Sequence, residues 1–334
     1  MGKAHSVSTV APHRISLVGG GSDLPTVSDK IGGGCVSFTI PKYIYVTCKR
    51  HSIDQFQERY RLQYSLTEVV NERSKIVNNI IRETLIYLDI DEPLVISTSS
   101  DLPTGSGLGS SSSFTVALLL ALRKLFDVPT NPFELAEDAY QIERIINGNS
   151  VGRQDQFAAS IGGYNYYQFD RDGSVSINPI MNSHQQISSL AQSSLLIWTG
   201  LSRSASTVLK KQSDLSESLL DKYTELNELT MKFYQLLKLR SFSVKDYGYY
   251  IRQNWSIKKG LASAISNSEI ESIIEQCLRL GTTACKVLGA GGGGYILALG
   301  TNKQTEAWLE SEGLHTERIG YDPNGARVLS SFVL

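Results

Sequence analysis

Hydrophobic and polar positions recur with recognisable periods along the first hundred residues. Residues 41–49, PKYIYVTCK, alternate well enough to predict a strand, and LVISTSS at 94–100 predicts a second. The amphipathic stretch between them, from about Ser74 to Tyr87, predicts a helix. Sheet and helix are therefore interleaved from the start of the chain.

The pattern then becomes helical before it returns to strands. Ser113–Leu125 is rich in Ala and Leu and contains no glycine, which predicts a buried helix. Asn131-Pro132 is typical of a helix start, and the apolar pattern behind it runs to about Ile146. GGYNYYQFD and SVSINPI, joined across Asp172-Gly173, then predict a hairpin.

The second half of the chain has mostly helical periodicity. It runs from about Ser204 to Leu239 and again from Ser268 to Leu280, and strand-like runs return at 294–299 and 328–334. This mixed order, with no internal repeat, predicts an α+β fold. We place a boundary near residues 180–195, which divides the chain into domains of residues 1–190 and 191–334.

The composition of the 334 residues narrows the possible partners. Lys and Arg number 32 against 33 Asp and Glu, so no global charge attracts nucleic acid or an anionic membrane. No signal peptide and no membrane span are recognisable, so we expect a cytoplasmic protein, as a monomer or homodimer. The four cysteines lack metal-binding spacing and are expected to be small buried hydrophobic residues.

A run of glycine and serine precedes the helix predicted from Ser113. In DLPTGSGLGSSSS, Gly105, Gly107 and Gly109 alternate before four serines. Closely spaced glycines let backbone N–H groups approach a ligand, and the free amides of a helix N-terminus attract anions. The segment therefore predicts a phosphate cradle, with a structural turn as the alternative. It has no Walker lysine, no GxGxxG spacing and no GxSxG elbow.

Two further glycine-rich segments lie far from the first. APHRISLVGGGSDLP at 11–25 combines a basic residue, a strand-like run and three glycines before an acid, and VLGAGGGGYILAL at 287–299 places five glycines before a strand. Together with Pro103 and the GLGSS that follows it, they resemble the three motifs of the GHMP kinase superfamily over nearly the whole chain. The resemblance implies an ATP-dependent small-molecule kinase, with an N-terminal domain similar to ribosomal protein S5 and a C-terminal ferredoxin-like α+β domain.

This resemblance also implies which residues bind ATP and Mg²⁺. It assigns the metal to Ser111 and Glu143, although a single Glu is also typical of a helix surface. Lys286, just before the third motif, would add a charge near the phosphates or would be a solvated lysine at the end of a helix. The residues expected to bind ATP are Pro103, Gly105, Ser106, Gly107, Leu108, Gly109, Ser110, Ser111, Gly291 and Gly292.

The resemblance assigns the catalytic roles to Asp155 and Arg14. Asp155 would accept the proton of the substrate hydroxyl or hold it in line; alternatively, it caps a helix that begins at Gln156. Arg14 matches the basic residue of the first motif. It would keep Asp155 ionised and stabilise charge in the transition state, and a structural salt bridge is its alternative.

The first motif carries information on the acceptor. It reads Gly19-Gly-Gly-Ser-Asp23 where galactokinases have GEHTD, so two side chains that hold sugar hydroxyls are absent and galactose is not expected. GGGSD, GRQDQFAASIGGYN and NWSIKKG resemble the branch of D-glycero-D-manno-heptose 7-phosphate kinases and related anomeric sugar kinases. That resemblance implies phosphorylation of the anomeric hydroxyl to a 1,7-bisphosphate, for the synthesis of nucleotide-activated heptose.

A phosphorylated acceptor needs a second anion site. Arg203 or the pair Lys258-Lys259 would supply it, unless these are solvated surface charges. Two alternatives remain: a 1-kinase of a free sugar such as fucose or mannose, and a non-catalytic sugar and nucleotide sensor on the same fold. The residues expected to bind the acceptor are Gly20, Gly21, Ser22, Asp23, Gly163, Arg203, Lys258 and Lys259.

Overall fold

The computed structural model describes residues 4–52, 58–180, 184–201, 216–239 and 243–333, and within these ranges the strands form two sheets. The first sheet has eight strands in the order β12-β1-β2-β5-β3-β4, with β6 paired to β2 and β7 paired to β6. The second has the order β11-β8-β10-β9. The strands are β1 (Ala4–Gly19), β2 (Gly33–Arg50), β3 (Tyr60–Gln63), β4 (Thr67–Val70), β5 (Leu94–Ser100), β6 (Tyr164–Phe169), β7 (Val175–Pro179), β8 (Ser194–Trp198), β9 (Ala284–Val287), β10 (Tyr295–Leu299), β11 (Thr316–Arg318) and β12 (Arg327–Val333).

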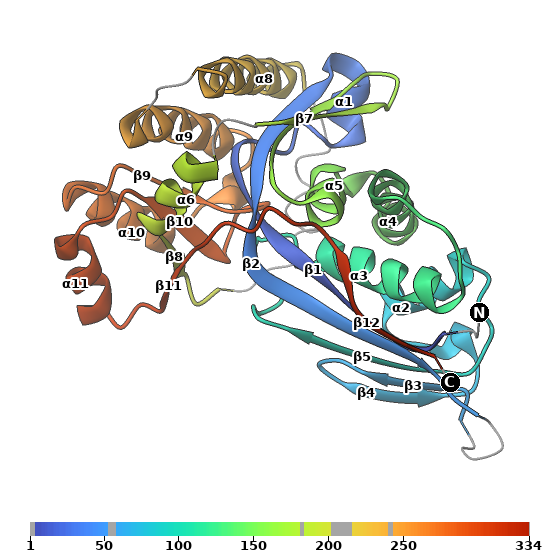
Figure 1. The fold of residues 1–334 in the computed structure, drawn as a ribbon. Coiled ribbons are helices and arrows are strands. Elements are labelled where there is room, and N and C mark those ends of the chain that lie inside the picture. The colour runs from blue at the N-terminus through green and yellow to red at the C-terminus, as the bar shows by residue number, and fades with distance from the viewer. Residues whose placement is uncertain (1–3, 53–57, 181–183, 202–215, 240–242, 334) are drawn as a thin grey trace.

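Helices cover the first sheet and join it to the second (Figure 1). A buried apolar cluster lies between β1, β2 and β5 and the helices α2, α3 and α4. A second cluster joins the other end of β1 and β2 to α8, α9 and the four-stranded sheet. The helices are α1 (Pro25–Ile31), α2 (Asn79–Tyr87), α3 (Ser110–Leu125), α4 (Pro132–Asn147), α5 (Gln154–Ile161), α6 (His184–Gln192), α8 (Glu217–Leu237), α9 (Val244–Lys259), α10 (Ser268–Arg279) and α11 (Lys303–Ser311), with short 3₁₀ turns at Arg73–Lys75, Gly148–Ser150 and Ser263–Ile265.

The two sheets confirm the predicted α+β class. In the smaller sheet the spatial order of the strands is fourth, first, third, second, and helices follow the first and third strands, as in a ferredoxin-like domain. The division at residue 190 stays a prediction: it falls within α6, and β12 lies beyond it in sequence but pairs with the first sheet. β12 pairs antiparallel with β1, so the last seven described residues belong to the eight-stranded sheet.

Most predicted elements are present, with shifted ends. The predicted strands correspond to β2, β5, β10 and β12, and β6 and β7 form the predicted hairpin. α2 begins only at Asn79 because the Asn78 side chain accepts a hydrogen bond from the Ile81 N–H and caps it there. The long helix is α8, and the part of the prediction that covers 204–215 lies outside the described residues.

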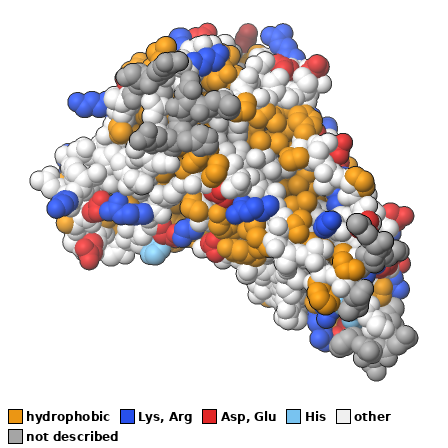
Figure 2. Space-filling model, in the orientation of Figure 1, with side chains coloured by type: hydrophobic (Ala, Val, Ile, Leu, Met, Phe, Trp, Pro, Cys, Tyr) orange, Lys and Arg blue, Asp and Glu red, His pale blue; other side chains and the backbone are white. Residues whose placement is uncertain are grey.

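The four cysteines are all free and buried, as predicted. None of the described helices is both long and apolar enough to cross a membrane. On the face that Figure 2 shows, Lys and Arg side chains are interspersed with Asp and Glu.

Candidate active site

Twelve of the predicted site residues line one cavity of about 420 Å³, to which both the N-terminal and the C-terminal parts of the chain contribute. It is bounded by β1, the loop before α3, α4, the start of α5, α9 and the glycine run before β10. The predicted residues that line it are Arg14, Gly21, Asp23, Gly105, Ser106, Gly107, Gly109, Ser110, Ser111, Glu143, Asp155 and Lys258.

The glycine-serine loop has the backbone geometry of an anion cradle. Gly105, Gly107 and Gly109 have φ values of 75°, 79° and 80°, a conformation that side chains with a Cβ rarely adopt. Gly109 is the N-cap of α3 and provides no side-chain cap, so the first amides of α3 are left for a ligand. Ser106 and Ser110 follow the first and the third of these glycines, and their hydroxyls are 3.0 Å apart.

The third glycine run packs directly on this loop. A Cβ on Gly107 would lie 2.5 Å from the Leu288 carbonyl oxygen, and a Cβ on Gly289 would lie 2.7 Å from the Gly107 Cα. The Tyr295 N–H donates to the Ser106 carbonyl oxygen at 3.0 Å. The backbone of the third glycine run is therefore in direct contact with the backbone of the glycine-serine loop. Gly289 and Ala290 line one side of the cavity.

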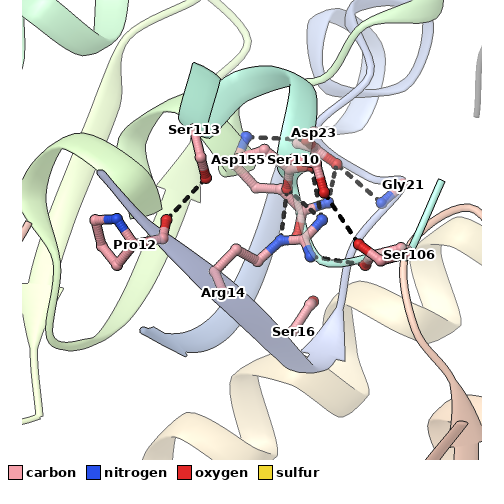
Figure 3. Close-up of polar contacts among 12 residues, drawn as sticks. Pro12, Arg14, Ser16, Gly21, Asp23, Ser106, Ser110, Ser113 and Asp155 are labelled. Carbon is pink, nitrogen blue, oxygen red and sulfur yellow. Dashed lines mark hydrogen bonds and ion pairs between the residues drawn. The ribbon is translucent and has the colours of Figure 1, made fainter. Parts of the chain in front are cut away.

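Arg14 and Asp155 both line the cavity, and their side chains are in direct contact (Figure 3). The Arg14 Nε donates to Asp155 Oδ1 at 2.7 Å and its Nη2 donates to Oδ2 at 2.6 Å, while its Nη1 donates to the Gly107 carbonyl oxygen at 2.9 Å. Arg14 therefore does form the salt bridge that was considered as its alternative role. Because the same guanidinium also donates to Gly107, it links the Asp155 carboxylate to the glycine-serine loop. The alternative role of Asp155 as a cap before Gln156 is wrong, because α5 begins at Gln154.

Glu143 and Ser111 line the same cavity, which fits their predicted role as metal ligands. Glu143 is only 4% exposed, so the alternative of a surface acid is wrong. Burial raises the pKa of Glu143 to about 7, and among the described residues no Lys or Arg forms an ion pair with it. Mg²⁺ is usually held by one or two carboxylates together with substrate phosphates, and a buried carboxylate beside a phosphate cradle suits that ligand set.

The first motif, Gly19–Asp23, contributes one acidic residue, Asp23, to the cavity lining. Gly19, Gly20 and Gly21 all have positive φ, at 87°, 77° and 90°. Gly21 and Asp23 line the cavity, whereas Ser22 is buried and exchanges hydrogen bonds with the backbone of Gly34. The predicted acceptor contacts of this loop stay predictions.

The predicted cations lie in different places. Lys258 is 6% exposed, lines the cavity and donates to the Gly289 carbonyl oxygen at 3.2 Å. Lys259 faces away and pairs with Glu271 at 2.7 Å, and Arg203 lies outside the described residues. Lys286 is not a solvated lysine: it is 1% exposed, and its Nζ donates to the carbonyl oxygens of Ser16 and Leu17 at 3.0 Å each.

Several predicted residues do not line the cavity. Gly163 donates its N–H to the Thr39 hydroxyl at 2.7 Å, and Gly292 donates to the Ile265 carbonyl oxygen at 2.8 Å. Pro103 is exposed, Leu108 is buried in the core, and Gly20 and Gly291 also lie outside the lining. Their predicted ligand contacts stay predictions.

Other residues line the cavity although sequence reasoning did not select them. Gln154 precedes Asp155 in GRQDQ, so proximity to a motif was the available signal. The end of α4 and the turn after it also line the cavity, through Asn147, Ser150 and Val151. These residues carry no motif, and only the fold brings them to the site.

Comparison with known families matches both halves of the chain. Residues 74–163 match the model described as GHMP kinases N terminal domain, and residues 239–310 match GHMP kinases C terminal. The chain is 30% identical over 301 residues to D-glycero-alpha-D-manno-heptose 7-phosphate kinase of Campylobacter jejuni, an alignment that covers 87% of this chain and 88% of that protein.

Solved structures are similar over almost the whole length. A D-glycero-D-manno-heptose 1-phosphate kinase from Bacteriodes thetaiotaomicron matches with a TM-score of 0.75 and 22% identity, covering 98% of this chain and 99% of that one. Lactococcus lactis galactokinase, crystallised with galactose, matches with a TM-score of 0.74 and 16% identity, covering 96% and 95%. At these identities the structural matches concern the fold.

Proposed function

The chain belongs to the GHMP kinase family, and from this premise we propose that it transfers the γ-phosphoryl group of ATP to the anomeric hydroxyl of D-glycero-D-manno-heptose 7-phosphate. It is a sugar kinase, an ATP-dependent phosphotransferase with an alcohol group as acceptor. The 30% identical relative supports the heptose phosphate as acceptor, and the product would be a 1,7-bisphosphate that serves nucleotide-activated heptose synthesis. The expectations of a cytoplasmic protein and of a monomer or homodimer stay predictions.

The observation that carries the proposal is the Arg14–Asp155 pair held against the phosphate loop within one cavity. Asp155 would align the acceptor hydroxyl and take its proton, and Arg14 would keep that carboxylate ionised and offset charge on the phosphoryl group. Glu143 and Ser111 would hold Mg²⁺, which neutralises the phosphate oxygens when bound. The amides at the start of α3 would bind the phosphates.

The test is an ADP-release assay with MgATP and a panel of free and phosphorylated heptoses and hexoses, with ³¹P and ¹³C NMR to locate the new phosphate. We expect the highest kcat/KM with D-glycero-D-manno-heptose 7-phosphate and phosphorylation at C1. A higher kcat/KM with free fucose or mannose would show that the acceptor is a free sugar and not the heptose phosphate. No ADP release from folded protein with any member would support the non-catalytic sensor instead.

Lys258, which lines the cavity, should decide between phosphorylated and free sugars. Lys258→Ala should lower kcat/KM for the phosphorylated acceptor by about 10–100-fold relative to the unphosphorylated sugar, because a hydrogen bond to a charged group contributes about 1.5–3 kcal/mol. Lys259→Ala is the matched comparison and should change this ratio less, since its side chain pairs with Glu271. Equal losses on both sugars would assign Lys258 to the nucleotide instead.

The same lysine predicts a pH dependence. Burial lowers the pKa of Lys258 from 10.5 to about 8, so its positive charge is present below pH 8 and is lost as the pH rises through that value. We therefore expect the affinity for the phosphorylated acceptor to fall between pH 7 and 9, while the affinity for the free sugar changes little. Lys258→Ala should abolish the difference between the two titrations, measured by calorimetry.

A further inference from the structure

Three protein N–H groups donate hydrogen bonds to the buried carboxylate of Asp23. Its Oδ1 accepts hydrogen bonds from the Gly21 N–H at 2.9 Å and from the Gln154 side-chain amide at 3.1 Å, and its Oδ2 accepts from the Gln154 backbone N–H at 3.0 Å. The residue is 2% exposed. The protein itself therefore uses three of the about four acceptor sites of this carboxylate.

The backbone N–H of Gln154 is the first N–H group of α5, the helix that carries Asp155 in its first turn. Helix starts leave N–H groups that need acceptors, and the local N-cap, Arg153, makes no side-chain capping bond. Asp23, which is distant in sequence, supplies the missing cap, because its Oδ2 accepts the hydrogen bond of the Gln154 backbone N–H. Figure 3 shows Asp23 and Asp155 within the same group of polar contacts.

The surrounding backbone is shaped for this contact. A Cβ on Gly152 would lie 1.9 Å from Asp23 Oδ2, so the carboxylate reaches Gln154 only because residue 152 is a glycine. The turn that precedes Asp23 is made of Gly19, Gly20 and Gly21, all with positive φ, and the Asp23 carboxylate that follows it meets the start of α5.

We propose that Asp23 is a positioning residue, which caps α5 and thereby sets where Asp155 meets Arg14 and the acceptor, rather than a ligand of the sugar. The step from helix position to turnover rests on the proposed kinase function. The capping contact itself does not. A displacement of about 1 Å at a reacting group is enough to cost about 100-fold in rate, so a loosened helix start would lower kcat strongly.

The test replaces Asp23 by Asn, which keeps the size of the side chain but removes one acceptor oxygen. We expect faster hydrogen exchange, by about tenfold or more, in a peptide covering 152–161. We also expect kcat for the heptose 7-phosphate to fall by about 100-fold, with the acceptor Kd, measured with a non-hydrolysable ATP analogue, within threefold of wild type. Gly152→Ala should give the same pattern while every carboxylate is kept.

The matched control is Asn302→Ala, which removes the side-chain cap of α11, a helix that does not line the cavity. It should speed exchange in α11 and leave turnover unchanged. Unchanged exchange in α5 on Asp23→Asn, or a rise in acceptor Kd that accounts for the whole loss of kcat/KM, would overturn the proposal. If the wild type itself turns over no sugar, the kinase proposal fails, and the exchange experiment still decides the capping role.

Discussion

Replacing Asp155 by Asn is expected to lower kcat by about 10³-fold, because a positioned general base contributes about 10²–10⁴ to such a step. The Asn amide is also a donor that faces the donors of Arg14, so the bidentate pair would be lost. Nucleotide binding depends on the backbone of the glycine loop and should stay within about threefold of wild type. Single-turnover kinetics and calorimetry with a non-hydrolysable ATP analogue measure the two effects separately.

The control for this variant is Asp29→Asn, which removes the same charge from an exposed position. It should leave kcat and stability unchanged. Unaltered turnover in Asp155→Asn would remove Asp155 from the chemistry and leave it as the structural partner of Arg14. A loss confined to nucleotide affinity would instead show that the pair shapes the phosphate loop through the Arg14 contact with Gly107.

Local sequence signals predicted the parts of the site that depend on the backbone of one segment. The alternating glycines before Ser110 predicted a loop whose backbone can approach a ligand closely, and all three have positive φ. Asn131-Pro132 predicted the start of α4, and the Asn131 side chain does accept a hydrogen bond from the Glu134 N–H. Such features are readable because cause and effect lie within a few residues of each other.

Features that depend on distant segments were not predictable in this way. The capping of α5 by Asp23 joins residues from opposite ends of the N-terminal half, and no periodicity records it. Lys286 lies on β9, whose four residues are too few to show a pattern, so its burial against the carbonyl oxygens of β1 was invisible. β12 returns to β1 across the proposed domain boundary for the same reason: strand pairing is non-local.

The contact between the two glycine runs should be as sensitive as the catalytic pair. Gly107→Ala places a Cβ 2.5 Å from the Leu288 carbonyl oxygen and forces an L-residue into a φ near 79°. The backbone strain alone costs about 1–2 kcal/mol, and relief of the clash requires the third glycine run to move away from the phosphate loop. We expect nucleotide affinity and kcat/KM each to fall by about 10²-fold or more.

Gly313→Ala separates the effect of backbone strain from the effect of the clash with Leu288. Gly313 has a similar φ of 67°, but no heavy atom lies within 4 Å of its added Cβ. That variant should lose stability by about 1–2 kcal/mol, seen as a lower Tm, and keep full activity. If Gly107→Ala merely matches Gly313→Ala, with lower Tm but normal nucleotide binding, the packing of the two runs does not shape the cradle. A large loss of nucleotide affinity at a similar Tm would show that the C-terminal domain completes the phosphate site.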